Sequence, residues 1–337
     1  MGTMRFDRFK TSRYVNGNYI VKISSMSNTF FGISKRALRV GEDLLSEFPD
    51  SIDLKISNRC SHGCKFCHES SIPGGDILDI EKTKSILSQL PKKPIEIAVG
   101  GGNVLECLDE TEDILGWLVE RGYNTRITIT LDDLKSSGDP ELDERIVSLI
   151  SSKVGGLGIS VTSDLGRIIE EISKKKDATS YYKPSPLDYT DLGKELSFGP
   201  QIVFHVIAGI TSLNYIKYLI ENTRGSVLVL GYKQWGRALN NKLPDLSKLR
   251  EYIGSVIKDK TKNDLTSLGF DNLGIEQLGI KDMIGENKWK GMYLGDEGTC
   301  SMYIDAVKGE FARTSRSPER VSWNNIKLLD YYASLSA

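Results

Sequence analysis

A regular alternation of strand-like and helical segments constrains the fold of this chain most strongly. Six apolar runs of strand type are each followed by a segment with apolar residues at helical spacing. The strand-like runs cover residues 51–57, 95–99, 125–131, 156–162, 202–209 and 226–232, and the helical segments cover 79–90, 109–121, 140–151, 164–175, 212–223 and 246–258. Strands that alternate with helices run parallel with right-handed crossovers, which predicts an α/β barrel or an open α/β sheet.

Two of these strands have a distinctly polar face. Side chains at alternate positions of a strand point the same way, and polar residues hold those positions in the first and third strands: Asp53, Lys55, Ser57, Arg126, Thr128 and Thr130. A parallel strand covered by helices on both faces reads almost entirely apolar. We therefore expect a barrel whose polar interior holds a ligand.

Shorter β-like segments flank this alternating region. Residues 19–24 and 29–34 predict a hairpin before the first strand, and residues 299–315 predict a second hairpin with Lys308 and Gly309 at its turn. The second hairpin is expected to cap or close one end of the core. The chain then divides into an N-terminal β-hairpin extension (1–48), a barrel core (49–260) and a C-terminal extension that closes the barrel (261–337).

The composition limits the environment and the partners. The 337 residues include 44 Lys and Arg against 45 Asp and Glu, which indicates no general affinity for nucleic acid but leaves room for a local basic groove. No apolar run approaches the roughly 18 residues of a membrane span, and the N-terminus lacks the order of a signal peptide. Five cysteines, an odd number, do not predict a disulfide framework. We expect a reducing, cytoplasmic location.

Three of the five cysteines lie within eight residues, directly after the first predicted strand. Residues 56–69 read ISNRCSHGCKFCHE, which places Cys60, Cys64 and Cys67 in a C-x3-C-x2-C pattern. A structural zinc ion usually has four ligands in two separated pairs, and Cys67 and His68 are sequence neighbours that would have difficulty ligating one ion together. A [4Fe–4S] cluster held by three thiolates keeps one iron open for a substrate or cofactor.

This pattern, with Phe66 as the aromatic residue before the third cysteine, resembles the radical SAM superfamily over residues 50–235. The resemblance implies a partial (β/α)6 TIM-like barrel, a [4Fe–4S] cluster on the three cysteines, and S-adenosylmethionine (SAM) on the open iron, with Phe66 near its adenine. It also implies reductive cleavage of SAM to a 5′-deoxyadenosyl radical that abstracts hydrogen from a substrate, and a reducing partner of flavodoxin or ferredoxin type. The C-terminal segments resemble those of phage-type members.

A glycine-rich turn follows the second predicted strand, where residues 99–106 read VGGGNVLE. Glycines at a strand end let the backbone approach a ligand, but they serve a tight turn equally well. In the resembled family a GGE-like motif here contacts the amino group of SAM. Gly100, Gly101 and Gly102 match that motif, while Asn103 replaces the acid and offers a side-chain oxygen without charge. Glu106 is either a substitute or an acid at a helix start.

Other strand ends give weaker candidates. Ser160 ends the fourth strand, where the family often places a ribose or carboxylate contact, and Ser163 fits a helix N-cap better. The family tends to bind adenine through backbone groups near Gly231 and Tyr232. Lys233, Trp235 and Arg237 either line a substrate mouth or form an exposed loop. His205, alone in an apolar strand, is interpreted as structural.

The sequence therefore predicts a radical SAM enzyme that acts on a small polar substrate, either a nucleotide or nucleobase or an amino-acid-like group. Two alternatives remain: a zinc-stabilised α/β binding protein without catalysis, and an iron–sulfur protein that only transfers electrons. The catalytic residues, the fate of SAM and the roles of Cys107 and Cys300 are not assigned by the sequence.

Overall fold

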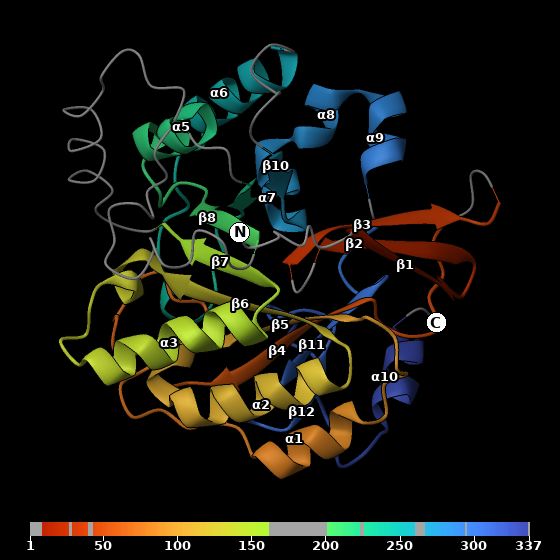
Figure 1. The fold of residues 1–337 in the computed structure, drawn as a ribbon. Coiled ribbons are helices and arrows are strands. Elements are labelled where there is room, and N and C mark those ends of the chain that lie inside the picture. Colours follow the sequence, from red (N-terminus) through yellow and green to blue (C-terminus); the bar gives the residue numbers. More distant parts are fainter. Residues whose placement is uncertain are drawn as a thin grey trace, which may run out of the picture.

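The structure, a computed structural model, describes residues 9–26, 29–39, 43–161, 201–222, 226–259, 267–293 and 295–335. Two sheets organise these residues (Figure 1). One has three strands and the other has ten, in the order β10-β9-β8-β7-β6-β5-β4-β11-β12-β13. None of the helices in these ranges has the length and apolar character needed to cross a bilayer.

The ten-stranded sheet contains all six strands of the predicted alternation. They are β4 (Ser51–Ser57), β5 (Glu96–Gly101), β6 (Asn124–Thr130), β7 (Gly156–Ser160), β8 (Gln201–Ile207) and β9 (Ser226–Leu230). Neighbours in this series pair in parallel, as predicted. The α/β class is confirmed, and among the described strands the sheet stays open between β10 and β13.

Helices connect successive strands and cover one face of the sheet. They are α1 (Ile80–Leu87), α2 (Leu108–Glu120), α3 (Pro140–Lys153), α5 (Leu213–Asn222) and α6 (Ser247–Lys258). Figure 1 shows α1, α2 and α3 side by side, and α1 and α3 each contact α2. The predicted helix at 164–175 lies outside the described residues. Asp139 is the N-cap of α3, and its carboxylate accepts hydrogen bonds from the backbone N–H groups of Glu141 and Leu142. These N–H groups have no partner within the helix.

Alternation along the strands separates an apolar face from a polar one. Ile52, Leu54 and Ile56 of β4 are fully buried and belong to the core, as are the corresponding residues of β5 to β9. The opposite face, called the inner face below, carries Asp53, Lys55 and the other polar residues of the predicted interior. The period-2 pattern of the sequence therefore assigned the two faces correctly.

The C-terminal region extends the sheet at both edges. It contains β10 (Ser267–Phe270), β11 (Ser301–Asp305), β12 (Glu310–Ala312), β13 (Val321–Ser322), α7 (Asn272–Leu278), α8 (Ile280–Ile284), α9 (Glu286–Met292) and α10 (Leu328–Ser334). The predicted hairpin is confirmed as the antiparallel pair β11–β12. β11 pairs in parallel with β4 and lengthens the sheet, and the expected closure of the core by this region stays a prediction. At the other edge β10 pairs with β9. The proposed domain boundary at residue 260 stays a prediction.

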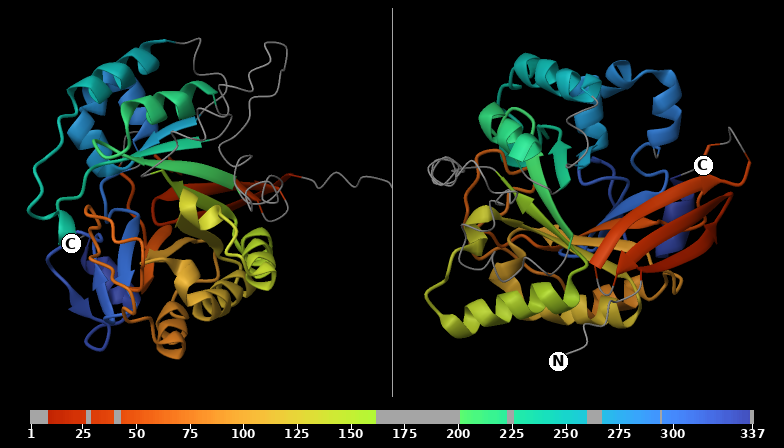
Figure 2. Two further views of the ribbon diagram at one scale, coloured as in Figure 1. Left: turned by 90° about the vertical axis from the view of Figure 1, so that its left-hand side faces the viewer. Right: turned by 45° about the horizontal axis from the view of Figure 1, so that its top comes forward.

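The N-terminal strands form a separate antiparallel sheet. It comprises β1 (Phe9–Asn16), β2 (Tyr19–Met26) and β3 (Thr29–Ala37). The expected hairpin corresponds to β2 and β3, and β1 is an additional strand. Gly17 adopts a positive φ of 58° in the turn between β1 and β2, a conformation that glycine reaches without steric cost. Figures 1 and 2 show these strands, in red, beside the blue C-terminal elements.

A buried carboxylate joins the two sheets. Asp50, which immediately precedes β4, is fully buried. Its oxygens accept hydrogen bonds from Tyr14 Oη at 3.1 Å, Asn16 Nδ2 at 2.7 Å and Tyr19 Oη, and Lys35 Nζ lies 3.0 Å away. Burial and the nearby negative charge of Asp50 raise the pKa of Tyr14 and Tyr19, so both phenols keep their protons and donate.

We expect Asp50→Ala to lower the free energy of unfolding by about 3 kcal/mol, because it leaves buried donors and the Lys35 charge without their acceptor. Urea unfolding followed by circular dichroism measures the change. Asp43→Ala, which removes an exposed carboxylate, is the control and should stay within about 0.5 kcal/mol of wild type. Equal stability of the two variants would contradict a joining role for Asp50.

Candidate metal and cofactor site

The cysteine loop, residues 58–79, leaves the carboxyl end of β4 and folds back on itself. Backbone hydrogen bonds join Cys60 N to Ile72 O at 3.0 Å and Asn58 N to Asp76 O at 2.7 Å. Cys60, Cys64 and Cys67 are free thiols of intermediate exposure. The structure thus places the three predicted ligands on one partly exposed loop at the end of a parallel strand, where chemistry gathers in α/β folds.

Burial is the main influence on two of these thiols. It raises the pKa of Cys60, and Glu106 and the other two cysteines raise it further. Burial and the neighbouring Cys67 raise the pKa of Cys64, while the Arg237 charge opposes that rise. Both groups are therefore neutral thiols near pH 7, and a metal that binds them as thiolates must displace their protons. Among the described residues, no group of three His, Cys, Asp or Glu is arranged to hold a single metal ion.

The glycine-rich turn packs directly on the cysteine loop. Gly101 has a φ of 118°, and a Cβ there would lie 2.4 Å from Ser57 O; a Cβ on Gly102 would lie 2.1 Å from Arg59 O. Gly102 N donates to Ser57 O at 2.6 Å. Gly101 and Gly102 are thus required because neighbouring backbone atoms of the protein lie where a side chain would be. Gly100 has open space beside its Cα and is the one that can approach a ligand closely.

Asn103 has a different environment from the one expected. Its Oδ1 accepts from Leu105 N at 3.1 Å and caps the 3-10 helix η1 (Val104–Cys107), while its Nδ2 donates to Asp133 Oδ1 at 2.9 Å. The side-chain oxygen expected to accept from an amino group is therefore already bonded. Asp133 was not identified from the sequence. It lies in η2 (Leu131–Leu134) after β6, and its only sequence signal is an acidic turn at the end of a strand with a polar face.

Glu106 anchors the cysteine loop. Its two carboxylate oxygens accept from Ser61 N at 2.7 Å and from Ser61 Oγ at 3.0 Å. The alternatives drawn from the sequence were a substitute for the missing acid and an acid at a helix start. Glu106 does lie in the first turn of η1, as the second alternative expected. In addition, both of its oxygens accept from the residue that follows Cys60.

Arg237 holds the same loop from a different segment of the chain. It lies in η5 (Gly236–Ala238), after β9, where its Nε donates to Cys64 O at 2.9 Å and its Nη1 donates to Ser71 O at 2.5 Å. Its backbone N–H also donates to Cys67 O at 3.0 Å. Arg237 therefore supports the cysteine loop and is not simply part of an exposed loop. A place for this segment at a substrate mouth stays a prediction.

The backbone groups proposed for adenine already have partners in the chain. Gly231 N donates to Asp271 Oδ1 at 2.8 Å, and Tyr232 N and O pair with the Gln277 amide at 2.8 and 3.0 Å. The Tyr232 ring is buried. A cavity of ≈ 260 Å³ adjoins this segment, and its lining includes Lys233, Trp235 and Arg316. Adenine contact at Gly231 and Tyr232 stays a prediction that requires these hydrogen bonds to rearrange or adenine to use the cavity.

Phe66 and Ser160 lie at positions compatible with the predicted roles. Phe66 is half-buried on the cysteine loop, next to Cys67. Ser160 ends β7 on the inner face, opposite Thr130 of β6 and His205 of β8 in the sheet register. Ser163 lies outside the described residues. The structure thus brings Ser160 to the carboxyl edge of the sheet, and its contact with a cofactor stays a prediction.

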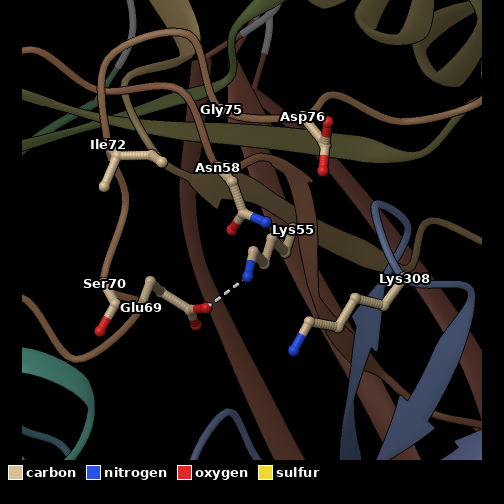
Figure 3. Close-up of a pocket in the computed structure, with 8 residues that line it drawn as sticks. All are labelled: Lys55, Asn58, Glu69, Ser70, Ile72, Gly75, Asp76 and Lys308. Carbon is tan, nitrogen blue, oxygen red and sulfur yellow. Dashed lines mark hydrogen bonds and ion pairs between the residues drawn. The ribbon is translucent and has the colours of Figure 1, made fainter.

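A buried lysine organises the inner face below the cysteine loop. Lys55 Nζ lies 2.7 Å from Glu69 Oε2 and 3.2 Å from Asp305 Oδ2, and Tyr303 Oη donates to Glu69 Oε1 at 3.1 Å. Figure 3 shows Lys55 pointing at Glu69 in a cavity of ≈ 180 Å³, with Lys308 on the far side. The strand β11 thus adds an acid and a phenol to the predicted polar interior.

Further charges and two neutral imidazoles extend this polar surface. Asp53 lies on the inner face, where part of the residue is exposed to solvent. Protein atoms crowd around its carboxyl group, and this desolvation raises its pKa, while the positive charge of Lys233 partly offsets the rise. Burial lowers the pKa of His68 well below its ordinary value, and lowers the pKa of His205 to about 4 with help from Arg126. His205 lies over Gly158, whose missing side chain makes room for the ring. The structure thus gives His205 a place on the inner face.

No protein-family model and no curated protein matches this chain in sequence. Solved structures of SuiB from Streptococcus suis share its fold. SuiB bound to S-adenosylmethionine matches with a TM-score of 0.57 at 14% identity, covering 86% of this chain and 66% of SuiB. SuiB bound to precursor peptide SuiA gives a TM-score of 0.57 at 15% identity, covering 86% of this chain and 65% of SuiB. This chain therefore corresponds to just under two thirds of SuiB.

We expect Arg237→Ala to expose the cysteine loop to protease, because the loop loses two hydrogen bonds to a charged group. Trypsin cleavage after Lys65, followed by mass spectrometry, should become about ten-fold faster than in wild type. Arg237→Lys keeps the charge without the guanidinium fork and should give an intermediate rate. Arg121→Ala, at the end of α2, is the control. Cleavage at Lys65 that does not respond to any substitution of Arg237 would contradict the clamp.

We also expect the metal-free thiols of Cys60 and Cys64 to react slowly with iodoacetamide near pH 7. Their raised pKa values leave less thiolate than free cysteine has, so labelling should accelerate as pH rises, with midpoints above that of free cysteine. Mass spectrometry of labelled peptides measures each rate. Labelling at pH 7 faster than that of glutathione would show activated thiols and contradict this prediction.

Proposed function

We propose that this protein is a radical SAM enzyme that carries one [4Fe–4S] cluster on Cys60, Cys64 and Cys67 and acts on a small polar substrate. One observation carries the proposal: three free, partly exposed thiols lie on one loop that two separate segments clamp at the carboxyl edge of a parallel sheet. The fold shared with a SAM-bound protein supports it.

The donor set fits a cluster. Thiolates are the ligands that iron–sulfur clusters take, and three of them leave one iron for a further ligand. The loop anchors leave the thiols free, because Arg237 and Glu106 bind its backbone and Ser61 and do not contact a cysteine sulfur. Gly100 pairs with Lys55 of β4 in the sheet, and the space beside its Cα is open. When bound, the cluster and SAM would supply one-electron reductive cleavage of SAM and the hydrogen abstraction that follows.

The chain's own residues would bind and orient the substrate on the inner face. This surface carries charges of both signs. Lys55 and Lys233 are its basic residues, and Asp53, Glu69 and Asp305 are its acidic ones. His68 and His205 are neutral there and offer hydrogen bonds without charge. A surface of mixed charge favours a substrate that itself carries an amine and an acid. We therefore favour an amino-acid-like group, free or within a peptide, over a nucleotide.

Two further parts of the proposal concern partners and location. The reaction requires an electron from a reducing donor, for which a flavodoxin- or ferredoxin-like protein is proposed. Free thiols on a partly exposed loop suit a reducing, cytoplasmic environment. SuiB binds a precursor peptide, which supports a peptide among the substrates to be tested first.

We expect the anaerobically reconstituted wild-type protein to be brown, to contain about four irons, and to form 5′-deoxyadenosine from SAM after dithionite reduction. Cys64→Ala should lose most of the iron and all measurable SAM cleavage, because one of three ligands is gone. Iron and sulfide assays, together with chromatography of the nucleoside product, measure both effects. Cys300→Ala removes a buried cysteine outside the loop and should retain both.

The same assays separate the rival functions. Colourless protein with one bound zinc ion would identify a zinc-stabilised binding protein. A cluster that cycles between redox states without forming 5′-deoxyadenosine, even with amino-acid, peptide and nucleotide candidates added, would identify an electron-transfer protein. Either result contradicts the proposed function.

A further inference from the structure

A small polar network lies where the ends of β5 and β6 meet the cysteine loop. Its centre is the Asp133 carboxylate, whose side chain is 9% exposed. Oδ2 accepts from Thr130 N at 2.7 Å and Thr130 Oγ1 at 2.8 Å, which fixes the orientation of the carboxylate. Oδ1 accepts from Asn103 Nδ2 at 2.9 Å. Three chain groups thus hold one negative charge beside the glycine-rich turn.

The nearby polar groups are already engaged elsewhere. Asn103 Oδ1 caps η1, both Glu106 oxygens bind Ser61, and the neighbouring Asp132 pairs with Lys135 on the same turn. Asp133 differs from Glu106 and Asp132 because its Oδ1 faces the side chain of His62 on the cysteine loop, at 3.0 Å. An ammonium group that approaches this edge of the sheet would find its strongest acceptor there.

The imidazole of His62 occupies the place next to Asp133 Oδ1 where such an ammonium group would bind. His62, between Cys60 and Cys64, places Nε2 3.0 Å from Asp133 Oδ1 and 3.4 Å from Thr130 Oγ1. The His62 side chain is 26% exposed, so solvent and ligands can reach this position. The imidazole therefore marks a site with at least two oxygen acceptors within reach of one nitrogen.

We propose that Asp133 is the acceptor for the ammonium group of the methionyl part of SAM, that Asn103 positions it, and that His62 gives up the place to the cofactor. The inference rests on the proposed function. In the glycine-rich turn Asn103 stands where the resembled family has an acid, and we assign the role of that acid to Asp133, which follows β6. Asn103 donates an N–H to Asp133, and the Asp133 carboxylate supplies the negative charge for the ammonium group. A histidine in the loop then shields the carboxylate when SAM is not bound.

Binding measurements test this assignment without relying on turnover. We expect Asp133→Asn, reconstituted with its cluster, to bind SAM about 10- to 100-fold more weakly than wild type, because a hydrogen bond between two charged groups is lost. Anaerobic equilibrium dialysis with radiolabelled SAM measures the Kd. Asp132→Asn removes an equal charge from the adjacent residue and should bind SAM as wild type does.

A second ligand separates a local contact from general damage. 5′-Methylthioadenosine has the nucleoside and sulfur of SAM but lacks the amino-acid part, so Asp133→Asn should bind it as wild type does. Equal SAM affinity in Asp133→Asn and wild type would overturn the inference, as would a matching loss of affinity for both ligands. Failure of the wild-type protein itself to bind SAM would instead refute the proposed function.

A charge swap keeps the test decisive if the single variant is poorly folded. Asn103→Asp with Asp133→Asn retains an amide–carboxylate pair, and Asp remains a good cap for η1. The swapped protein should recover most of the lost SAM affinity, since the charge stays beside the same position. A swapped protein that loads its cluster but binds SAM no better than Asp133→Asn would overturn the inference.

Discussion

Parallel strand pairing is the constraint on which the rest of the structure depends. From β10 to β11 every strand in the large sheet pairs in parallel with its neighbour. All their carboxyl ends therefore meet at one edge, and the segments that follow β4, β5, β6 and β9 must converge there. The cysteine loop, the glycine-rich turn, the Asp133 turn and the Arg237 segment are these four segments. Their proximity follows from the topology, although they are far apart in sequence.

Hydrogen bonds to the backbone, more than side-chain pairs, then fix the cysteine loop. Arg237 binds carbonyl oxygens of the loop, Glu106 binds the Ser61 N–H, and the backbone N–H of Asn103 donates to Arg59 O. Such contacts hold the course of the chain while leaving the cysteine sulfurs free. A loop of this kind can present three thiols to a metal group without the extensive core that holds ordinary side chains in place.

The inner face shows how low solvent exposure changes the chemistry of ordinary side chains. Lys55 lies within ion-pair distance of Glu69 and Asp305, whereas burial lowers the pKa of His68 and of His205 so that both imidazoles are neutral. Burial is the main cause of both shifts, and nearby positive charges add to it: Lys233 and Lys55 lower the pKa of His68, and Arg126 lowers that of His205. The result is a surface on which ion-paired side chains lie beside neutral imidazoles.

The sequence by itself determined the α/β class, the two faces of the strands and the gathering of three cysteines in one loop, because these follow from local periodicity and spacing. Tertiary structure alone decided that β11 joins β4, that Arg237 and Glu106 hold the loop, and that Asn103 faces Asp133. Each depends on partners from separate strands or loops, for which short-range sequence pattern carries no signal. The glycines illustrate the difference: the sequence showed that Gly101 and Gly102 permit a close approach. Only the fold showed that the end of β4 approaches Gly101 and that the cysteine loop approaches Gly102.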